Sequence, residues 1–394
     1  MPKSGSLQDD DAIMSRESLT RTADVMVIGG GLIGCSIALR LAQAKLRVCV
    51  LDRAEPGAEA SSAAAGMLSP QGETAEPDAF FELCAASRDL YPNYIAEIEE
   101  LSGQDLGYSR DGTLLVAMDD DECRALEKLH AAQSRQGLPI DRLAPEEIHR
   151  RVPGLSPEIR LGLFIPGDHW VDNERLSAAV VVACRRLGVD IRPQHAVTKL
   201  NVRGGRVEDI EVMTAIASAG NIKLSANHFV IAAGCWSAAL IEPLGIKLSI
   251  EPCRGQMMEF DSPADLPLVV RAGHHYLVPR PGRRVLVGTT AEYVGFDKSV
   301  TGEGMRAILE GAQRIAPFVR GLKFRRAWSG LRPDTADHLP ILGLGEIPNL
   351  FFATGHFRNG ILLAPMTAQI LCDLILKSGT TQPIAAYRPA RFRP

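Results

Sequence analysis

One segment near the beginning of the chain, residues 24–52, restricts the possible folds more than any other part of the sequence. Residues 24–29 form a short apolar run that ends in glycine, which is typical of a buried parallel strand. Residues 31–44 have apolar side chains at helical spacing, and residues 47–51 form a second apolar strand closed by an aspartate. A turn with the pattern GxGxxG joins the first strand to the helix. This order of elements within about thirty residues predicts a dinucleotide-binding βαβ unit.

Each glycine of this motif has a physical role. Gly29 allows a tight turn, Gly31 lets the backbone approach a pyrophosphate, and Gly34 lets the helix pack against the sheet. Asp52, at the end of the second strand, is placed to accept hydrogen bonds from ribose hydroxyls. Its charge disfavours NADP, although the neighbouring Arg53 weakens that argument. The unit does not distinguish FAD from NAD, and a glycine-rich turn that only packs a helix is the structural alternative. The predicted cofactor contacts of this unit are Gly29, Gly31, Leu32, Ile33, Gly34, Asp52 and Arg53.

Two later segments favour a flavin as the cofactor. In residues 60–67, small side chains let backbone amides approach a large planar ligand, and two serine hydroxyls can bind phosphate. Residues 231–234 end a predicted strand with small side chains. The alternatives are a serine-capped helix start for the first segment and an ordinary buried strand and turn for the second. The contacts predicted here are Ala60, Ser61, Ser62, Ala64, Ala65, Gly66, Met67 and Gly234, together with Val197 of another predicted strand.

The rest of the chain mixes parallel βαβ signals with antiparallel strands. Residues 248–288 are mostly β in pattern. A nucleotide-binding sheet assembled from distant segments, with a β-rich domain inserted, would explain this order. We therefore expect a mixed α/β fold. Periodic apolar side chains predict helices over residues 79–101, 119–136, 173–186, 302–315 and 360–377.

Composition excludes several other classes of protein. The chain of 394 residues has a net charge of −4 and no basic tract, so no nucleic-acid partner is expected. It has no apolar stretch long enough for a membrane helix. The eight cysteines are single and none forms a CxxC pair, which predicts no metal site and a reduced, cytoplasmic protein. Residues 1–22 are polar and are expected to be a disordered tail, so either Met1 or Met14 could be the natural start.

Taken together, these segments resemble the glycine oxidase and D-amino-acid oxidase family of FAD-dependent enzymes. The resemblance extends over most of residues 24–380 and is closest to the glycine oxidases of thiamine biosynthesis. Its most specific pieces are Ser-Ala-Ala-Ala-Gly-Met-Leu at 62–68, Trp-Ser-Gly-Leu-Arg-Pro at 328–333 and Gly-His-Phe-Arg-Asn-Gly-Ile-Leu-Leu-Ala-Pro at 355–365. Related sarcosine oxidases attach their flavin through a cysteine near the second piece. No cysteine lies between residues 254 and 371, so we expect noncovalent FAD.

The resemblance implies a Rossmann-like FAD-binding domain interleaved with an antiparallel, β-rich substrate domain. We expect the FAD-binding domain to comprise residues 23–104, 158–235 and 326–385. The substrate-binding domain is then expected to comprise residues 105–157 and 236–325. A homotetramer is the assembly that the resemblance suggests.

The activity implied is oxidative deamination of glycine, sarcosine or small D-amino acids. A hydride passes from the substrate Cα to flavin N5, and oxygen then gives hydrogen peroxide. The imine hydrolyses to a 2-oxo acid and ammonia, or is consumed in thiazole synthesis. Because the cofactor carries this chemistry, no acid or base residue is expected. A dehydrogenase of the same fold with another electron acceptor is the alternative, and a FAD-binding redox sensor without turnover is a third hypothesis.

The resemblance also assigns residues to the substrate. Arg332 matches the arginine that binds the substrate carboxylate, for which a guanidinium fork is suited. Tyr276 matches a tyrosine that donates to the same carboxylate, Arg358 a second arginine near substrate and flavin, and His274 a pocket histidine. Without the resemblance, Arg332 could equally be part of a structural ion pair.

Two departures and one flavin-binding segment complete the predicted site. Ala291 replaces a pocket methionine and could widen the site, whereas Ser69 stands where a glycine can occur and could narrow the entrance. A helix starting at Gly360 would place its positive end near the flavin. The residues expected to line the flavin ring are Gly355, His356, Arg358, Asn359, Gly360, Ile361 and Leu362.

Overall fold

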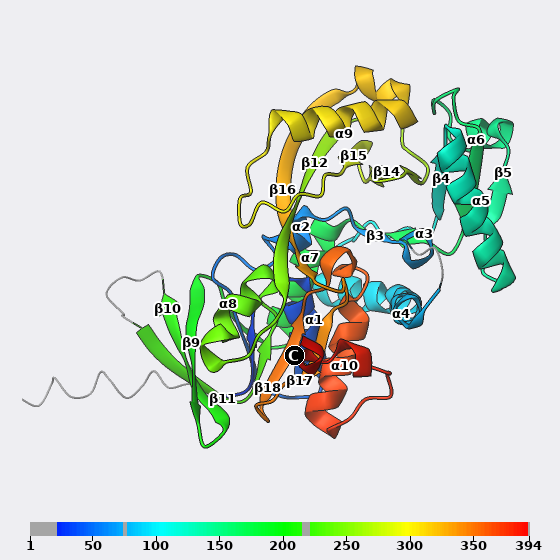
Figure 1. Ribbon diagram of the computed structural model, residues 1–394. Helices are drawn as coiled ribbons and strands as arrows, with labels where there is room; N and C mark the ends of the chain where they lie inside the picture. Colours follow the sequence, from blue (N-terminus) through cyan, green and yellow to red (C-terminus); the bar gives the residue numbers. More distant parts are fainter. Residues whose placement is uncertain (1–21, 74–76, 215–220, 393–394) are drawn as a thin grey trace, which may run out of the picture.

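The computed structural model describes residues 22–73, 77–214 and 221–392. The tail predicted to be disordered lies outside these residues, except that Thr22 is the first residue of strand β1 (Thr22–Ile28). Two lobes are visible in Figure 1, each built around one large sheet. The long strands β12 (Ile250–Asp261) and β16 (Lys323–Thr335) run from the upper lobe toward the lower one.

The lower lobe contains the predicted βαβ unit. Strand β1 pairs in parallel with β2 on one side and with β11 on the other, and β11 pairs in parallel with β18. Strands β9 and β10 extend this sheet as an antiparallel ribbon from β11. Five strands in parallel, from β18 to β8, with antiparallel strands added at β17 and at the β9–β10 ribbon, confirm the expected α/β class. The further strands of the sheet are β2 (Val48–Leu51), β8 (Asp190–Arg192), β9 (His195–Arg203), β10 (Arg206–Thr214), β11 (Asn221–Ile231), β17 (Ile341–Leu344) and β18 (Leu350–Thr354).

The upper lobe is built on the second sheet, in the order β16-β12-β15-β14-β13-β4-β6-β5. All its pairings are antiparallel except that of β13 with β4. Strands β6 and β16 pair in this sheet; β6 lies within, and β16 overlaps, the ranges 158–235 and 326–385 that were expected to form the FAD-binding domain. The further strands are β4 (Thr113–Ala117), β5 (Asp141–Leu143), β6 (Leu161–Ile165), β13 (Val269–Ala272), β14 (His275–Arg280) and β15 (Arg284–Gly288).

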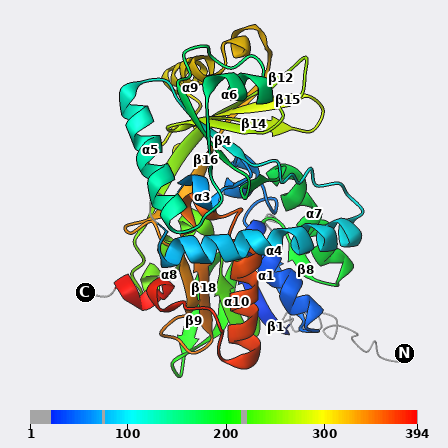
Figure 2. The same ribbon diagram turned by 90° about the vertical axis from the view of Figure 1, so that its right-hand side faces the viewer.

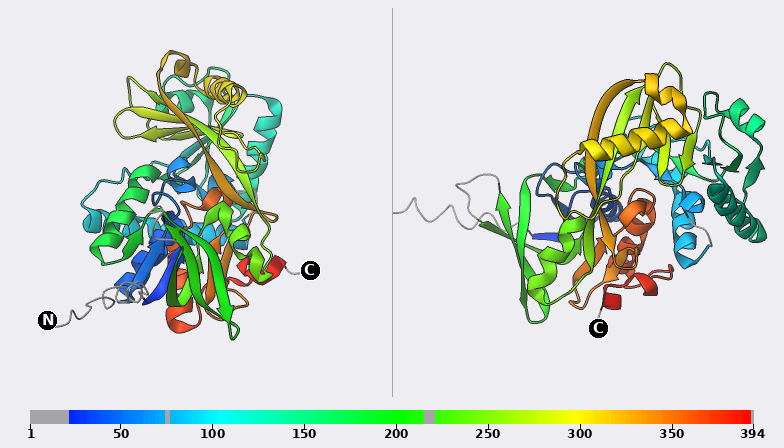
Figure 3. Two further views of the ribbon diagram at one scale, coloured as in Figure 1. Left: turned by 90° about the vertical axis from the view of Figure 1, so that its left-hand side faces the viewer. Right: turned by 45° about the horizontal axis from the view of Figure 1, so that its top comes forward.

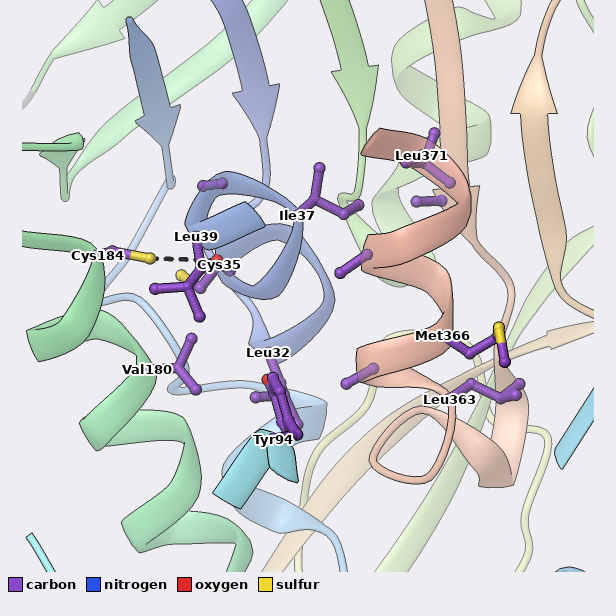
Figure 4. Close-up of a cluster of buried hydrophobic side chains, with 14 of the residues drawn as sticks. Leu32, Cys35, Ile37, Leu39, Tyr94, Val180, Cys184, Leu363, Met366 and Leu371 are labelled. Carbon is purple, nitrogen blue, oxygen red and sulfur yellow. Dashed lines mark hydrogen bonds between the residues drawn. The ribbon is translucent and has the colours of Figure 1, made fainter. Parts of the chain in front are cut away.

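Helix α1 (Leu32–Gln43) is held in the largest hydrophobic core. It lies between α7 (Asn173–Arg186) and α10 (Ala364–Lys377), with α4 (Ala79–Ser102) alongside. Figure 4 shows Leu39 beside Val180 of α7, and Ile37 facing Leu371 of α10. All four side chains are fully buried, and burying each contributes roughly 1.5–3 kcal/mol. This packing fixes the glycine turn that precedes α1.

Helix α4 covers the other side of this core and crosses the molecule between the two lobes (Figure 2). It begins where Asp78 accepts a hydrogen bond from the backbone N–H of Phe81 at 2.8 Å. It ends at Gly103, which has a φ of +70°. The N-cap aspartate and C-terminal glycine explain why the apolar periodicity stops where it does.

Helices α5 (Asp120–Arg135), α6 (Pro145–Arg151) and α9 (Gly302–Ile315) belong to the upper lobe. Helix α9 lies over the outer face of the second sheet (Figure 3). Its N-cap is Thr301, whose hydroxyl oxygen accepts from the N–H of Gly304 at 3.1 Å. The remaining short elements are α2 (Ala60–Ala63), α3 (Pro70–Glu73), α8 (Ser237–Ile241) and the ribbon β3 (Met67–Leu68) with β7 (His169–Trp170).

The helix predicted over residues 360–377 begins later than expected. Residues 357–359 form a 3₁₀ turn, and α10 starts at Ala364 with Pro365 in its first turn. Proline is tolerated there because the first helical N–H groups have no intrahelical acceptor. The prediction that the helix N-terminus begins at Gly360 is therefore wrong. No helix among residues 22–73, 77–214 and 221–392 is long and apolar enough to cross a membrane.

Candidate active site

A cavity of about 830 Å³ lies where the two lobes meet. This is large within the range of roughly 300–1,000 Å³ that is usual for small-molecule sites. Its wall runs from the glycine turn after β1 to strands β14 and β16 of the second sheet. Among the predicted site residues, Leu32, Gly34, Ser62, Gly355 and Leu362 do not line it. Those that do are Gly29, Gly31, Ile33, Asp52, Arg53, Ala60, Ser61, Ala64, Ala65, Gly66, Met67, Ser69, Val197, Gly234, His274, Tyr276, Ala291, Arg332, His356, Arg358, Asn359, Gly360 and Ile361.

The glycine turn is packed too closely for larger residues. Gly29 has a φ of +109°, and a Cβ there would overlap the carbonyl group of Ala232, directly after β11. A Cβ at Gly34 would overlap the carbonyl oxygen of Gly29. Gly34 therefore shapes the turn without touching the cavity, as expected for a glycine that brings helix and sheet together.

Asp52 binds the same turn. One carboxylate oxygen accepts from the N–H of Gly30 at 2.7 Å and the other from Ala54 at 2.8 Å. Burial raises the pKa of Asp52, and these two hydrogen bonds oppose that shift. Each carboxylate oxygen can accept more than one hydrogen bond, so Asp52 retains capacity for a ligand hydroxyl.

Arg53, next to Asp52, is engaged with protein groups. Its guanidinium carbon lies 3.5 Å from the centre of the Trp236 ring, and it pairs with Glu59 at 3.0 Å. Trp236 in turn contacts Phe296, with ring centres 5.4 Å apart. Arg53 and Trp236 therefore form one side of the cavity at its nucleotide end.

The small-residue segment at 60–67 contains a short helix and forms part of the cavity wall. Residues 60–63 form the short helix α2, and Ser61 Oγ accepts from the N–H of Leu32 at 2.9 Å, so it binds the first turn of α1. Ser61 also lines the cavity, whereas Ser62 Oγ donates to the carbonyl of Glu59 at 3.1 Å. On the far side of this loop, the buried Arg280 donates to the carbonyl of Ala65 at 2.7 Å.

The turn at residues 356–361 also lines the cavity. It is fixed from behind by α4, because Tyr91 Oη donates to the carbonyl of Ile361 and Ser87 Oγ donates to that of Leu362 at 2.6 Å. His356 is buried beside Thr367, with Nε2 and Oγ1 3.0 Å apart. Burial lowers the pKa of His356 to about 3, so this ring is neutral at physiological pH.

Another part of the cavity wall contains Arg332 of β16 and Tyr276 of β14, which β12 and β15 separate in the second sheet. Arg332 Nη2 donates to Thr289 Oγ1 at 2.9 Å, and Nη1 donates to the carbonyl of Thr290 at 3.2 Å. None of the ion pairs among the described residues includes Arg332, in contrast to the structural ion pair considered from the sequence. Tyr276 Oη donates to Met257 Sδ at 3.2 Å.

Four other predicted residues line the cavity. Arg358 is exposed and lies 5.1 Å from the ring of Phe357, again without an ion pair among the described side chains. His274 is exposed in the turn between β13 and β14, and Ala291 is exposed after β15. Ser69 is buried, with its Oγ 3.3 Å from Thr113 Oγ1.

Several lining residues were not anticipated. Thr289 and Thr290 hold Arg332, and Met257 accepts from Tyr276. Gly255 lies directly under the Arg332 guanidinium, where a Cβ would overlap both Nη atoms. A glycine inside a strand often marks such a close approach. Of the lining residues that were not predicted, Gly255 is therefore the one that the sequence pattern could have indicated. Glu59, Trp236 and Arg271 also line the cavity without having been predicted.

The charges along the cavity are unevenly distributed. Of the described residues that line it, the acidic ones are Asp52 and Glu59, both near the glycine turn. The opposite end has Arg332 and Arg358 with no acidic lining residue among those described. This end is suited to bind an anionic group, because each guanidinium keeps its charge available.

The fold and the cavity are those of an oxidoreductase that binds a dinucleotide. The cavity residues fit FAD, since the glycine turn accommodates a pyrophosphate and small side chains line the wall toward Arg332. The family described as "FAD dependent oxidoreductase" matches residues 24–374. The chain belongs to this family.

Known relatives agree with this assignment. The chain is 35% identical over 377 residues to the bifunctional protein ThiO/ThiG of Trichormus variabilis, covering 94% of this chain and 55% of that protein. It is 32% identical over 386 residues to the glycine oxidase of Geobacillus kaustophilus, covering 95% and 98%. The crystal structure of the glycine oxidase from that organism matches with a TM-score of 0.89 at 32% identity, covering 95% of this chain and 100% of that one. The chain thus spans about half the length of the bifunctional relative.

Proposed function

We propose that the protein is an amino-acid oxidase that acts on glycine, sarcosine or small D-amino acids. The observation that carries this proposal is the Arg332 guanidinium at the cavity wall, held by neutral groups with no acidic partner among the described residues. Such an arginine is prepared to bind a carboxylate with two parallel hydrogen bonds. The names of the similar proteins, glycine oxidase and ThiO/ThiG, support an amino acid as the substrate.

In this proposal FAD, when bound, accepts the hydride from the substrate Cα. Arg332 binds the carboxylate and Tyr276 donates to it, because thioether sulfur is a weak acceptor that the Tyr276 hydroxyl can exchange for a carboxylate oxygen. Arg358 adds positive charge at the junction of substrate and cofactor. The turn at 356–361, fixed by Tyr91 and Ser87, lines the cofactor ring.

The remaining residues orient the cofactor. The turn containing Gly29 and Gly31 binds the pyrophosphate, and Asp52 accepts from the ribose.

The imine product is hydrolysed to a 2-oxo acid and ammonia, or used in thiazole formation, and oxygen is reduced to hydrogen peroxide. The fusion of a similar protein to ThiG supports the second fate of the imine.

The test uses purified protein loaded with FAD. Glycine, sarcosine, D-alanine, D-proline and L-amino acids are supplied in air, and peroxide and oxygen consumption are measured. We expect peroxide from glycine or another small substrate. Flavin reduction by substrate with slow reoxidation in air would instead identify a dehydrogenase, and absence of reduction by all these amines would refute the proposal.

A further inference from the structure

We propose that Thr289 is a positioning residue that sets the affinity of the site for carboxylates by orienting Arg332. This inference rests on the proposed role of Arg332 in the substrate site. Thr289 lies directly after β15, at the start of the connection to α9, and lines the same cavity.

The first argument is the chemistry of the contact. Thr289 Oγ1 accepts from Nη2 of Arg332 at 2.9 Å, and the carbonyl of Thr290 accepts from Nη1 at 3.2 Å. Both acceptors are uncharged. They fix the plane of the guanidinium without neutralising it, whereas a carboxylate in either place would compete with the substrate.

The second argument is that Thr289 is itself held in place. Its hydroxyl has carbonyl acceptors on Gln256 at 3.1 Å and on Thr290 at 3.2 Å. A hydroxyl that donates its single proton to a carbonyl keeps its lone pairs for Arg332. The N–H of Gln256 donates to Thr290 Oγ1 at 3.0 Å, which joins the same two threonines to strand β12.

The third argument is the space around the guanidinium. Gly255 lies against it, and a Cβ there would overlap Nη1 and Nη2. Arg332 therefore has strand β12 against one face and the two threonines at its Nη groups. An arginine held in its binding conformation loses less rotamer freedom when the ligand arrives, so the Thr289 contact contributes to affinity.

The experiment compares Thr289→Val with the conservative Thr289→Ser in FAD-loaded protein. Acetate binding is followed by the perturbation of the flavin spectrum, and KM and kcat are measured with glycine. We expect Thr289→Val to raise the acetate Kd and the glycine KM about three- to ten-fold, because the long Arg332 side chain must then be ordered when the ligand binds. The kcat should stay within about two-fold by the same reasoning, and Thr289→Ser should restore both constants.

The matched control is Thr301→Val. It makes the same substitution on the same connection but removes the N-cap of α9, outside the cavity wall. It should lower the melting temperature and leave the acetate Kd unchanged. If Thr289→Val does not fold, Thr289→Ala makes the same comparison.

A double-mutant cycle with Arg332→Ala identifies the route of the effect. If Thr289 acts through Arg332, then Thr289→Val should not weaken acetate binding further in the Arg332→Ala background. An unchanged acetate Kd in the single variant, or an equal loss in both backgrounds, would overturn the inference. Acetate binding through Arg332 without amine oxidation would refute the proposed function alone, and absence of acetate binding by the wild type would overturn both.

Discussion

Replacing Arg332 with lysine tests the geometry of the substrate end most directly. Lysine keeps the positive charge but lacks the planar fork that meets both oxygens of a carboxylate. Thr289 and Thr290 orient Nη2 and Nη1 of Arg332. Because lysine has one ammonium group in place of these two nitrogens, the variant should lose one hydrogen bond to the ligand. A hydrogen bond to a charged group contributes about 1.5–3 kcal/mol, so its loss should raise the substrate Kd roughly 10- to 150-fold. Arg332→Ala removes both hydrogen bonds to the substrate and should raise the substrate Kd by a further factor of similar size.

The assay is anaerobic stopped-flow reduction of the bound flavin at increasing glycine concentration, which separates the substrate Kd from the limiting rate. Arg326→Lys is the matched control, because Arg326 lies on the same strand but pairs with Glu259 at 2.8 Å and Glu174 at 2.7 Å, away from the cavity. We expect its Kd to stay near that of the wild type. A substrate Kd for Arg332→Lys within two-fold of the wild type would refute the role given to the guanidinium fork.

Three further predictions concern the groups around this site. Gly255→Ala should weaken glycine binding as Arg332→Ala does while FAD remains bound, because its Cβ would displace the guanidinium; an unaltered KM would contradict the packing described. Tyr91→Phe leaves the buried carbonyl of Ile361 without its donor, so FAD affinity should fall and the free energy of unfolding should decrease by about 1–3 kcal/mol. Tyr94→Phe, which loses only a contact with Ser36, should leave FAD affinity unchanged, and equal FAD titrations of the two variants would oppose this explanation. Because burial lowers the pKa of His356 from 6.5 to about 3, its contribution to stability is complete above pH 6.5 and is lost as the pH falls toward 3. Urea unfolding between pH 6 and 4 measures this effect: the free energy of unfolding of His356→Asn should fall by about 1.4 kcal/mol less per pH unit than that of the wild type. An equal pH dependence of the two free energies would contradict this prediction.

The parts of the fold that were predictable from sequence depend on local patterns. The βαβ unit has its signals within residues 24–52, and the helices expected over 173–186 and 302–315 have those bounds in the structure. The start of α10 was missed because apolar residues continue through the turn at 360–363 that precedes it. The pairing of β6 with β4 and of β16 with β12 could not be predicted, since strand pairing over long sequence separations leaves no local pattern.

The same limit applies to the candidate site. The motif pieces at 328–333 and 355–365 indicated Arg332 and Arg358, and the structure places both on one cavity. Their surroundings come from distant segments that the pattern does not connect to them. Thr289 is 43 residues from Arg332, and Tyr91 is 270 residues from Ile361. Residue type could therefore suggest an anion-binding arginine, but only the folded chain shows what holds it.

Two arginines that reach the same connection show how the chain separates structure from function. Arg254 is buried and pairs with Glu292 at 2.5 Å and Asp297 at 2.6 Å, so its charge is balanced within the protein. Arg332 is bound by Thr289 and Thr290 from the beginning of that connection, with no carboxylate of it in contact. Residues 289–301 thus supply acidic partners to Arg254, which binds this connection to β12, and neutral partners to Arg332, which lines the cavity. A protein carboxylate beside Arg332 would also orient the guanidinium, but it would neutralise the positive charge that binds the substrate carboxylate.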